Sequence, residues 1–396
     1  MNTKRSVIIT GGRAPAALEL ARCFAAEGWR VISAESQALY LSQSSRFVHK
    51  TVRVRPPHQD PKGFVDDLAK IIESEKAELL IPTCEEAFYV SAGKEKLSKN
   101  CRVWTDSNTK LHELHSKWRF NQLAKKIGLP VPASSLITNS NELKTYLKKS
   151  NSCVLKPEFS RFASKTLLLR NEIEKKSVKA SPSPQTPWVA QDLIEGREFC
   201  TYGLARDGKL LVHSVYSHDF TAGKGAGICF EAIRHPKILD WITRFVSETS
   251  FTGQIAFDFI ESKKDGLVYA LECNPRATSG IHLFDTPTER RQLVAAFAGD
   301  MNSANPLQPQ EGLLRHVALA MWLYGLPTIR TRADFLNWVR FIVQGKDVLF
   351  KISDPLPIFH QLLCFAVLAF QGLKSGTSAI EASTADIEWN GGEIIT

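Results

Sequence analysis

The chain has 396 residues, of which 43% are hydrophobic and 23% are charged, and this composition is typical of an ordinary soluble globular protein. At ~150 residues per domain, the length predicts two or three domains. The formal charge of +9 would suit nucleic acid, but the basic residues are spread through the chain without a long Lys/Arg run. We therefore expect no nucleic-acid partner, because an anionic small substrate such as a nucleotide explains the charge equally well.

Cysteine usage and the first residues predict a cytoplasmic location. The eight cysteines never form a C-x-x-C pair, and His282 is the only histidine close to Cys273, so we expect reduced thiols. The start "MNTKRSVIITGG" is basic, but its apolar run is too short for a signal peptide.

The first hundred residues alternate strand and helix patterns. The segments in chain order are strand "SVIIT", helix "APAALELARCFAAEG", strand "WRVISAE", helix "FVDDLAKIIESEKA" and strand "ELLIPT". This order is typical of a parallel sheet with crossover helices. We expect residues 1–113 to form a doubly wound α/β lobe.

A second lobe of mixed α+β type is expected over residues 114–300. It opens with a helix "SKWRFNQLAKKIG" that Gly128 ends, followed by the proline-pinned link "LPVPAS". The strands "SCVLKP" and "WVAQDLI" flank an exposed loop rich in proline and serine, and we assign residues 150–195 approximately to a lid subdomain.

The stretch "YALECNPRATSG" (269–280) places Glu272, Asn274 and Arg276 on alternate positions at the end of a strand. The preceding strand "GQIAFDFI" and the turn "ESKKDG" predict a hairpin. If Ile260 lies opposite Ala270, Asp258 faces Glu272 across that hairpin.

Two facing carboxylates repel each other unless a cation lies between them, and magnesium is the natural cation. Asn274 projects from the same face and adds a neutral oxygen, while Arg276 can pair bidentately with a phosphate or a carboxylate. The alternative is a solvated hairpin with an incidental Glu–Arg pair.

These residues resemble the ATP-grasp superfamily, in the branch with a carbamoyl-phosphate-synthetase-like amino-terminal lobe, over about residues 5–290. The resemblance implies an ATP-grasp fold that binds ATP and Mg2+, with Mn2+ as an alternative ion. "FDFI" and "ECNPR" look like the metal pair of the family. The implied metal ligands are Asp258, Glu272 and Asn274, and the implied phosphate-binding lysines are Lys117 and Lys156.

The segment "WVAQDLIEGREF" (188–199) looks like the adenine hinge and ribose segment of the family. This resemblance implies backbone contacts to adenine at Gln191, Asp192 and Leu193, apolar cover from Ile194, and a ribose contact from Glu198. Within the superfamily, "GREFCTYGLARDGKL" and "TGQIAFDFI…YALECNPR" look most like the mycosporine-glycine ligases, which join a cyclic enolised diketone to glycine.

Two segments compete as the cover of the phosphates. "PEFSRFASK" after Lys156 offers Ser160, Arg161, Ser164 and Lys165 but has no glycine. "TAGKGAG" (221–227) has three glycines that permit a close backbone approach, with Lys224 as its charge and catalytic candidate. Either segment can equally be a plain solvated loop.

Two features of the first lobe have alternative interpretations. "TGGRAPAALE" (10–19), with Glu35 ending the next strand, mimics a dinucleotide site, but it is not G-x-G-x-x-G and Pro15 explains the turn. "PTCEEAF" offers Thr83, Glu85 and Glu86 to an acceptor, or the two acids simply stabilise a helix start.

Residues 301–396 are expected to be mainly helical. "RHVALAMWLYGL" and "RADFLNWVRFIVQG" are typical of amphipathic helices. "LPIFHQLLCFAVLAFQGL" (356–373) is uncharged, but His360 and Gln361 interrupt it, so we expect a buried or partner-facing helix rather than a membrane span. A homodimer through this helix is the partner hypothesis.

The hypothesis for function is an ADP-forming carboxylate–amine ligase of small-molecule or natural-product biosynthesis. An anionic acceptor takes the γ-phosphate and an amine, such as an amino acid, displaces it, with Arg276 steadying the intermediate. A carboxylate and an enolate acceptor both remain open. The alternatives are an NAD(P)-dependent oxidoreductase and a nucleotide-binding protein without turnover.

Overall fold

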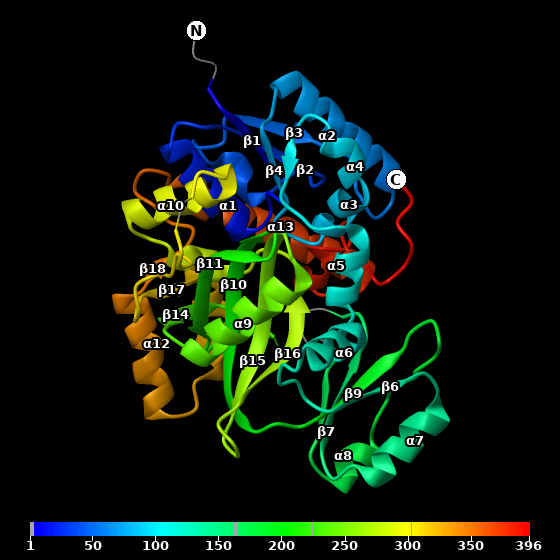
Figure 1. Ribbon diagram of the computed structural model, residues 1–396. Helices are drawn as coiled ribbons and strands as arrows, with labels where there is room; N and C mark the ends of the chain where they lie inside the picture. The colour runs from blue at the N-terminus through cyan, green and yellow to red at the C-terminus, as the bar shows by residue number, and fades with distance from the viewer. Residues whose placement is uncertain (1–3, 161–164, 224, 302) are drawn as a thin grey trace.

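The computed structural model describes residues 4–160, 165–223, 225–301 and 303–396. Figure 1 shows three parts: an amino-terminal lobe at the top, a central sheet below it, and a smaller sheet with its own helices at the lower right. One hydrophobic core runs through the first two parts, because Ile8 and Phe64 of the lobe belong to the same buried cluster as Phe257 of the central sheet.

The amino-terminal lobe is a five-stranded parallel sheet in the order β3-β2-β1-β4-β5. The doubly wound lobe is therefore confirmed. Its strands are β1 (Ser6–Thr10), β2 (Arg30–Glu35), β3 (Lys50–Arg53), β4 (Leu79–Ile81) and β5 (Arg102–Val103). Its helices are α1 (Pro15–Ala26), η1 (Leu41–Ser44), α2 (Pro61–Glu75), α3 (Glu86–Ala92), α4 (Lys94–Leu97) and α5 (Asn108–His115).

The central sheet has seven strands in the order β16-β15-β10-β11-β14-β17-β18. They are β10 (Gly196–Arg206), β11 (Lys209–Ser217), β14 (Cys229–Ile233), β15 (Gly253–Ser262), β16 (Val268–Asn274), β17 (Leu314–His316) and β18 (Lys346–Asp347), with the small hairpin β12 (Thr221–Ala222) and β13 (Ala226–Gly227) beside them. Helix α9 (Pro236–Thr249) covers one face, where Trp241 lies 5.3 Å from the ring of Phe257. This packing holds β15 in place from behind.

The smaller sheet is antiparallel, with the order β6-β9-β7-β8. It comprises β6 (Ser134–Ile137), β7 (Cys153–Pro157), β8 (Leu167–Leu169), β9 (Trp188–Asp192), α7 (Ser140–Lys149) and α8 (Glu172–Lys176). Helix α6 (Lys117–Ile127) connects this unit, which we call the lid, to the first lobe.

The chain after the central hairpin is helical, with one strand pair inserted. Its elements are η2 (Ser279–Leu283), α10 (Pro287–Ala298), α11 (Ala318–Ala320), η3 (Met321–Gly325), η4 (Leu326–Thr328), α12 (Arg332–Gln344), α13 (Leu356–Ser375) and α14 (Ala379–Ala382). A continuous helix over "RHVALAMWLYGL" is wrong, because Arg315 and His316 pair with Phe230 and Cys229 and extend the sheet. The helix expected at "RADFLNWVRFIVQG" is present as α12.

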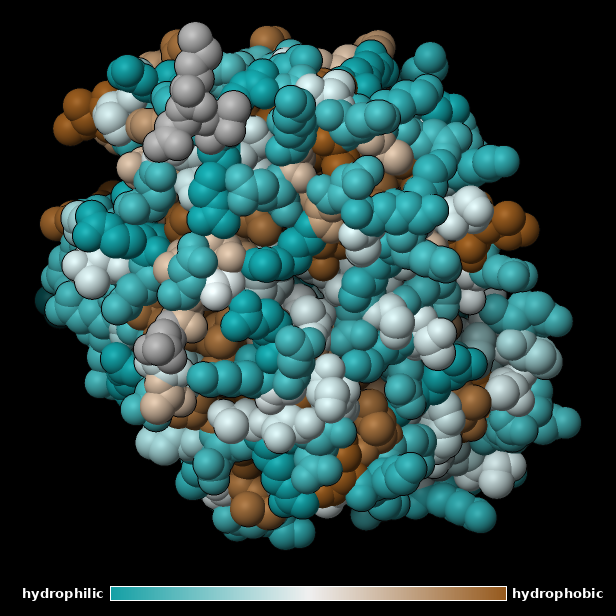
Figure 2. Space-filling view, turned by 45° about the horizontal axis from the view of Figure 1, so that its top comes forward, coloured by the Kyte–Doolittle hydropathy of each residue, from teal (hydrophilic) through white to brown (hydrophobic). Residues whose placement is uncertain are grey.

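Helix α13 is exposed rather than buried, so the buried alternative for this segment is wrong. Among the described residues, it is the one helix long and apolar enough to cross a membrane, with a mean hydropathy of 1.7 in its most apolar window. Only 11% of that window is buried. By contrast, the face shown in Figure 2 is mainly hydrophilic, with apolar side chains in small separate groups.

The last residues return to the first lobe, and we call residues 383–396 the C-terminal strap. Arg13 donates from Nη2 to Oδ2 of Asp386 at 2.8 Å, and the Ser36 hydroxyl donates to the same oxygen at 2.6 Å. Tyr89 donates its hydroxyl to the carbonyl of Glu388 at 2.7 Å. The carboxyl terminus consequently lies beside the amino-terminal lobe (Figure 1).

Trp389 anchors the middle of the strap. Its side chain is 4% exposed, stacks on the ring of His112 at 3.9 Å and lies 5.2 Å from the ring of Phe159, at the end of β7. Gly391, at φ 91°, lies so close to Phe159 that a Cβ atom there would come within 2.5 Å of the ring. The strap therefore joins the first lobe to the base of the lid.

We predict that Trp389→Ala lowers the free energy of unfolding by about 3–5 kcal/mol, because it leaves a cavity among aromatic rings. Urea unfolding followed by circular dichroism measures this. Ile395→Ala is the control, since this strap side chain is 75% exposed and its loss should change the free energy by less than about 0.5 kcal/mol. Equal effects of the two substitutions would contradict a structural role for the strap.

Candidate functional site

The two candidate carboxylates lie on the hairpin of β15 and β16. Ile260 pairs with Tyr269 and Phe259 with Ala270, so the expected pairing of Ile260 with Ala270 is wrong by one residue. An irregularity after Asp258 shifts the register, as a β-bulge does, and Leu271 is left without a partner on β15. Asp258 therefore does lie directly opposite Glu272.

The two facing carboxyl groups of Asp258 and Glu272 affect the pKa of each other. Burial, followed by the charge of Glu272, raises the pKa of Asp258. Burial opposes ionisation of Glu272 too, but the charges of Lys117 and Lys156 outweigh it and lower the pKa of that carboxyl. The lysines thus favour the ionised form of Glu272. A cation between the two carboxyl groups would also favour the ionised form of Asp258.

Two lysines from different elements converge on Glu272. Lys117, at the first position of α6, lies 3.5 Å from Oε2 of Glu272 and donates to the carbonyl of Ser160 at 3.0 Å. Lys156, on β7 of the lid, donates to the carbonyl of Leu271 at 3.2 Å. The unpaired bulge residue thus provides the acceptor for the lid lysine.

Burial lowers the pKa of Lys156 to about 8, although Glu272 acts in the opposite direction. The side chain is 6% exposed, so its charge lies in a partly desolvated site. With this pKa the side chain remains mainly protonated at neutral pH.

The donor set fits a magnesium ion. Asn274 Nδ2 lies 3.5 Å from Oδ2 of Asp258, so the amide oxygen and the two carboxylates of Asp258 and Glu272 belong to one group. No cluster of three or more His, Cys, Asp or Glu side chains occurs in the described part of the chain. Magnesium does not need such a cage, because it commonly uses one or two carboxylates together with substrate phosphates.

The predicted nucleotide residues lie on two sheets, the lid sheet and the central sheet. Cys200 pairs with Asp258, so Glu198, two residues before it, shares the face of the carboxylates. Val154 pairs with Gln191, so Lys156 and Gln191 share a face of the lid sheet.

The hinge between the lid and the central sheet runs through residues 192–195. Gln191 is 2% exposed and its amide nitrogen has no hydrogen-bond partner among the described residues. Asp192 is exposed, whereas Leu193 and Ile194, in the link to β10, are partly buried. A buried amide donor beside apolar side chains suits the edge of a planar heterocycle.

Arg276 lies between the hairpin and the first lobe. Its Nη2 donates to Oδ1 of Asn274 at 3.3 Å, and its Nε lies 4.0 Å from Oε1 of Glu85. The two regions considered for the acceptor, Arg276 and the segment Thr83–Glu86, are therefore one place in the structure. Burial raises the pKa of the Cys84 thiol, and the nearby charges of Arg13 and Arg276 act in the opposite direction.

Glu86 has a structural role. Its Oε1 accepts from the backbone amides of Thr83 and Cys84, at 2.9 and 3.1 Å, and from the Thr10 hydroxyl at 2.7 Å. These bonds fix the end of β4 against the end of β1. Of the two acids, Glu85 is the one that faces Arg276.

Glu35, the acidic residue of the alternative dinucleotide site, is bound by other residues of the protein. The Glu35 carboxylate pairs with the guanidinium of Arg13 and accepts from the backbone amides of Ser36 and Gln37 at 2.7 and 3.1 Å. Asp386 of the strap binds Arg13 and Ser36 at the same strand end. Glu35 is thus used inside the protein and is not presented to a ribose.

The phosphate cover is described only in part. Lys224, Arg161 and Ser164 lie outside the described residues, and Lys165 is exposed. Ser116 is a further residue of this region, which the sequence motifs do not predict. Its hydroxyl donates to the carboxylate of Glu158, which ties the start of α6 to the chain after Lys156. A serine directly before a helix is a typical N-cap, and this sequence feature could have predicted the position of Ser116 at the start of α6.

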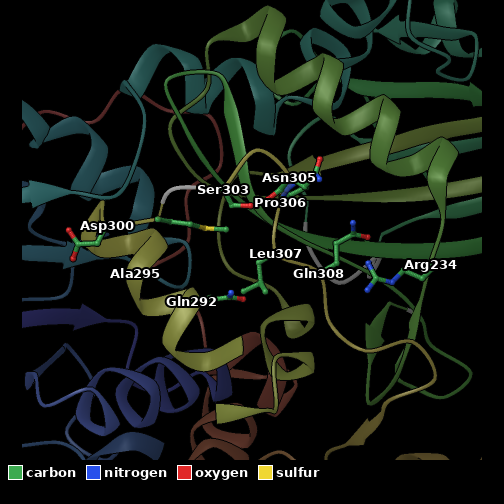
Figure 3. Close-up of a pocket in the computed structure, with 10 residues that line it drawn as sticks. Arg234, Gln292, Ala295, Asp300, Ser303, Asn305, Pro306, Leu307 and Gln308 are labelled. Atoms are coloured by element: carbon green, nitrogen blue, oxygen red, sulfur yellow. Dashed lines mark hydrogen bonds between the residues drawn. The ribbon is translucent and has the colours of Figure 1, made fainter. Parts of the chain in front are cut away.

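A separate cavity of ≈ 440 Å³ lies between α10 and the chain after it. Figure 3 shows Gln292 and Leu307 beside this cavity, with Arg234 and Gln308 together at one side. None of the expected site residues lines it, and its side chains form no cluster of titratable groups. We assign it no catalytic role.

Comparisons with known proteins agree with this geometry. A family model described as an ATP-grasp domain matches residues 114–280. A relative from Methanopyrus kandleri, the carbamoyl phosphate synthase large chain, C-terminal section, is 22% identical over 228 residues. That match covers 54% of this chain and 42% of the relative, so the chain spans less than half of its length.

Solved structures show the same fold at low identity. N5-carboxyaminoimidazole synthetase from Staphylococcus aureus aligns with a TM-score of 0.60 and 14% identity, over 79% of this chain and 82% of that one. L-amino acid ligase from Bacillus licheniformis aligns with a TM-score of 0.58 and 17% identity, over 76% and 77%. The expected ATP-grasp fold is confirmed, and the finer resemblance to mycosporine-glycine ligases stays a prediction.

We predict that Lys156→Ala weakens ATP binding by ~1–3 kcal/mol, the range for a lost hydrogen bond to a charged group. This corresponds to a roughly 5- to 150-fold higher Kd, which isothermal titration calorimetry with a non-hydrolysable ATP analogue and magnesium measures. Lys149→Ala, on the exposed end of α7 in the same lid, is the matched control. An unchanged Kd in the Lys156 variant would remove this residue from the site.

Proposed function

The chain carries an ATP-grasp domain over residues 114–280, and from this premise we propose that it is an ADP-forming ligase. It phosphorylates an anionic acceptor with MgATP and joins the acceptor to an amine. The single observation that carries the proposal is the convergence of Lys117 and Lys156 on the facing carboxylates of Asp258 and Glu272.

The protein's contribution to the reaction is positioning and charge neutralisation. Phosphoryl transfer needs little covalent chemistry from the protein, because the reaction depends on in-line alignment and on neutralising the phosphate oxygens. Lys117 and Lys156 bind phosphate oxygens from two sides, and Asp258, Glu272 and Asn274 hold the ion. Magnesium, when bound there, would offset the negative charge of the phosphates.

Adenine lies in this proposal between the lid and the central sheet. Gln191, Asp192 and Leu193 border its polar edge, and Ile194 covers its face. Glu198, on the same sheet face as the carboxylates, binds the ribose hydroxyls.

The acceptor lies in this proposal between Arg276 and the segment Thr83–Glu86. Arg276 pairs with an anionic oxygen and places it beside the terminal phosphate, because the arginine follows the ion-binding residue Asn274 by two positions. A carboxylate acceptor gives an acyl phosphate and then an amide. An enolate acceptor gives an enol phosphate and then an imine or enamine.

The amine is an amino acid in this proposal, which the name of the structural neighbour from Bacillus licheniformis supports. In both cases the nitrogen lone pair displaces phosphate, and the amine loses a proton. A role in natural-product biosynthesis fits either acceptor.

The test is a matrix of carboxylic acids and cyclic enolised diketones against amino acids, with ADP and phosphate release as the readout. We expect ADP to form only when both co-substrates are present, and mass spectrometry of that well identifies the product. ATP binding without ADP release in any well would instead support a nucleotide-binding protein without turnover. Repeating an active well with manganese decides whether that ion substitutes for magnesium.

We predict that Glu272→Gln abolishes magnesium-dependent turnover while the fold is kept, because it removes one formal charge from the ion's ligands and nearly preserves shape. ADP release measures activity, and the thermal midpoint checks the fold. Glu113→Gln, on α5 outside the described site, is a control with the same chemical change. Full activity of the Glu272 variant would refute the metal assignment.

We predict that Arg276→Lys lowers kcat and raises the acceptor KM, with ATP affinity nearly retained. Lysine keeps the charge but loses the planar fork that binds a carboxylate through two bonds. Arg291→Lys on α10, where the arginine side chain is 72% exposed, is the control. Wild-type kinetics with a lowered Tm would mean that Arg276 only holds the hairpin against Glu85.

A further inference from the structure

An apolar stripe runs along the exposed side of α13. Its members are large apolar side chains that are more than half exposed, together with one alanine. The exposed fractions are 60% for Leu356, 65% for Phe359, 53% for Leu363, 69% for Phe370 and 83% for Leu373, and Ala366 is also exposed.

The spacing of the stripe is that of a helix–helix seam. Successive members are separated by three, four, three, four and three residues, the alternation that keeps side chains on one line of paired helices. The opposite side of α13 contacts η1 and α14 of the same chain, where Pro357 and Gly372 are buried. The stripe therefore faces away from the protein, although helices usually turn their apolar face inward.

We propose that α13 pairs with α13 of a second copy in an antiparallel, two-fold symmetric dimer. In a two-fold interface each contact occurs twice. When two copies of the stripe run in opposite directions, each member must therefore meet a member of the other copy. The stripe meets this condition without a gap. Antiparallel pairing about its centre places Leu356 against Leu373, Phe359 against Phe370 and Leu363 against Ala366.

The sizes of the side chains suit this arrangement. At each end of the stripe a large side chain meets another large one, and at the centre the small Ala366 meets Leu363. A small residue near the crossing point lets two helix backbones approach to the usual 8–10 Å.

Charge on the helix favours the antiparallel direction. Lys374 is the only Asp, Glu, Lys or Arg on α13, and it lies at the carboxyl end. Parallel pairing would bring the two Lys374 ammonium groups together. Antiparallel pairing separates them by roughly the ~30 Å length of a 20-residue helix, beyond the range of their repulsion at physiological salt.

The area available is that of a specific dimer. At roughly 150–200 Å² for each fully exposed large side chain, the five large stripe residues together with Leu362, 54% exposed, offer roughly 600–750 Å² per copy. Specific interfaces bury ~800 Å² on each partner. Phe350 and Ile352, in the chain before α13, are also exposed, at 46% and 90%.

A lipid surface fits these observations less well. Helices that lie on a membrane carry many lysines and arginines beside their apolar face, whereas α13 carries one. The other polar residues of α13 are His360, Gln361, Gln371 and Ser375. A second copy of the chain needs no charge and explains the regular three–four spacing.

The test compares two adjacent substitutions that add the same charge. Phe370→Glu places a carboxylate in the stripe, and Gln371→Glu places it on the next exposed residue outside the stripe. Light scattering after size-exclusion chromatography of the full chain gives the mass at micromolar concentration. We expect a wild-type mass near twice the 44.2 kDa chain, unchanged in Gln371→Glu.

Phe370→Glu should raise the dimer dissociation constant at least roughly tenfold, because it buries an unpaired charge within the interface, opposite Phe359 of the second copy. Leu363→Glu is the second variant, and circular dichroism checks that both variants fold. A monomeric wild-type protein, or a dimer that survives both substitutions, overturns the proposal. A wild-type monomer that floats with phosphatidylcholine–phosphatidylglycerol vesicles overturns it in favour of lipid binding.

The ADP-release assay is independent of this outcome. A dimer without turnover would therefore contradict the proposed ligase and leave the pairing of α13 intact. An active monomer would contradict the pairing of α13 and support the proposed ligase.

Discussion

The facing pair of Asp258 and Glu272 is the interaction on which the arrangement of the site depends. Two partly buried carboxylates that face each other on adjacent strands destabilise the sheet unless positive charge is nearby. Here that charge comes from two directions, from Lys117 at the start of α6 and from Lys156 on the lid. The need to neutralise one hairpin thus explains why the first lobe, the lid and the central sheet converge at this point. A catalytic ion would complete the same balance of charge.

The β-bulge connects this electrostatic requirement to the backbone. Because Leu271 has no partner on β15, its carbonyl accepts from Lys156, and the bulge restores the register in which Asp258 meets Glu272. Arg276 then lies beyond the end of β16, where Glu85 of the first lobe can reach it. The hairpin therefore carries both the side chains proposed to bind the ion and, beyond its end, the proposed acceptor contact.

Local patterns predicted the elements of this site well, because each depends on a few neighbouring residues. Strand alternation placed Glu272 and Asn274 on one face, and the end of α6 followed from Gly128. The bulge did not follow from the pattern, since one extra residue in a strand leaves no mark in the sequence. The pairing of Arg276 with Glu85 and the exposure of α13 were also not predictable, because both depend on contacts between distant segments.

The C-terminal strap has a consequence for how the protein is made. Arg13 and Asp386, joined by a salt bridge, are separated by 373 positions in the chain. At about 5–20 residues per second, a ribosome needs roughly 20–75 s to travel between them. Once Phe88 and His112 have been synthesised, their rings lack the contact with Trp389 for the rest of that interval. The lobe that is synthesised first is therefore among the last parts of the molecule to be finished.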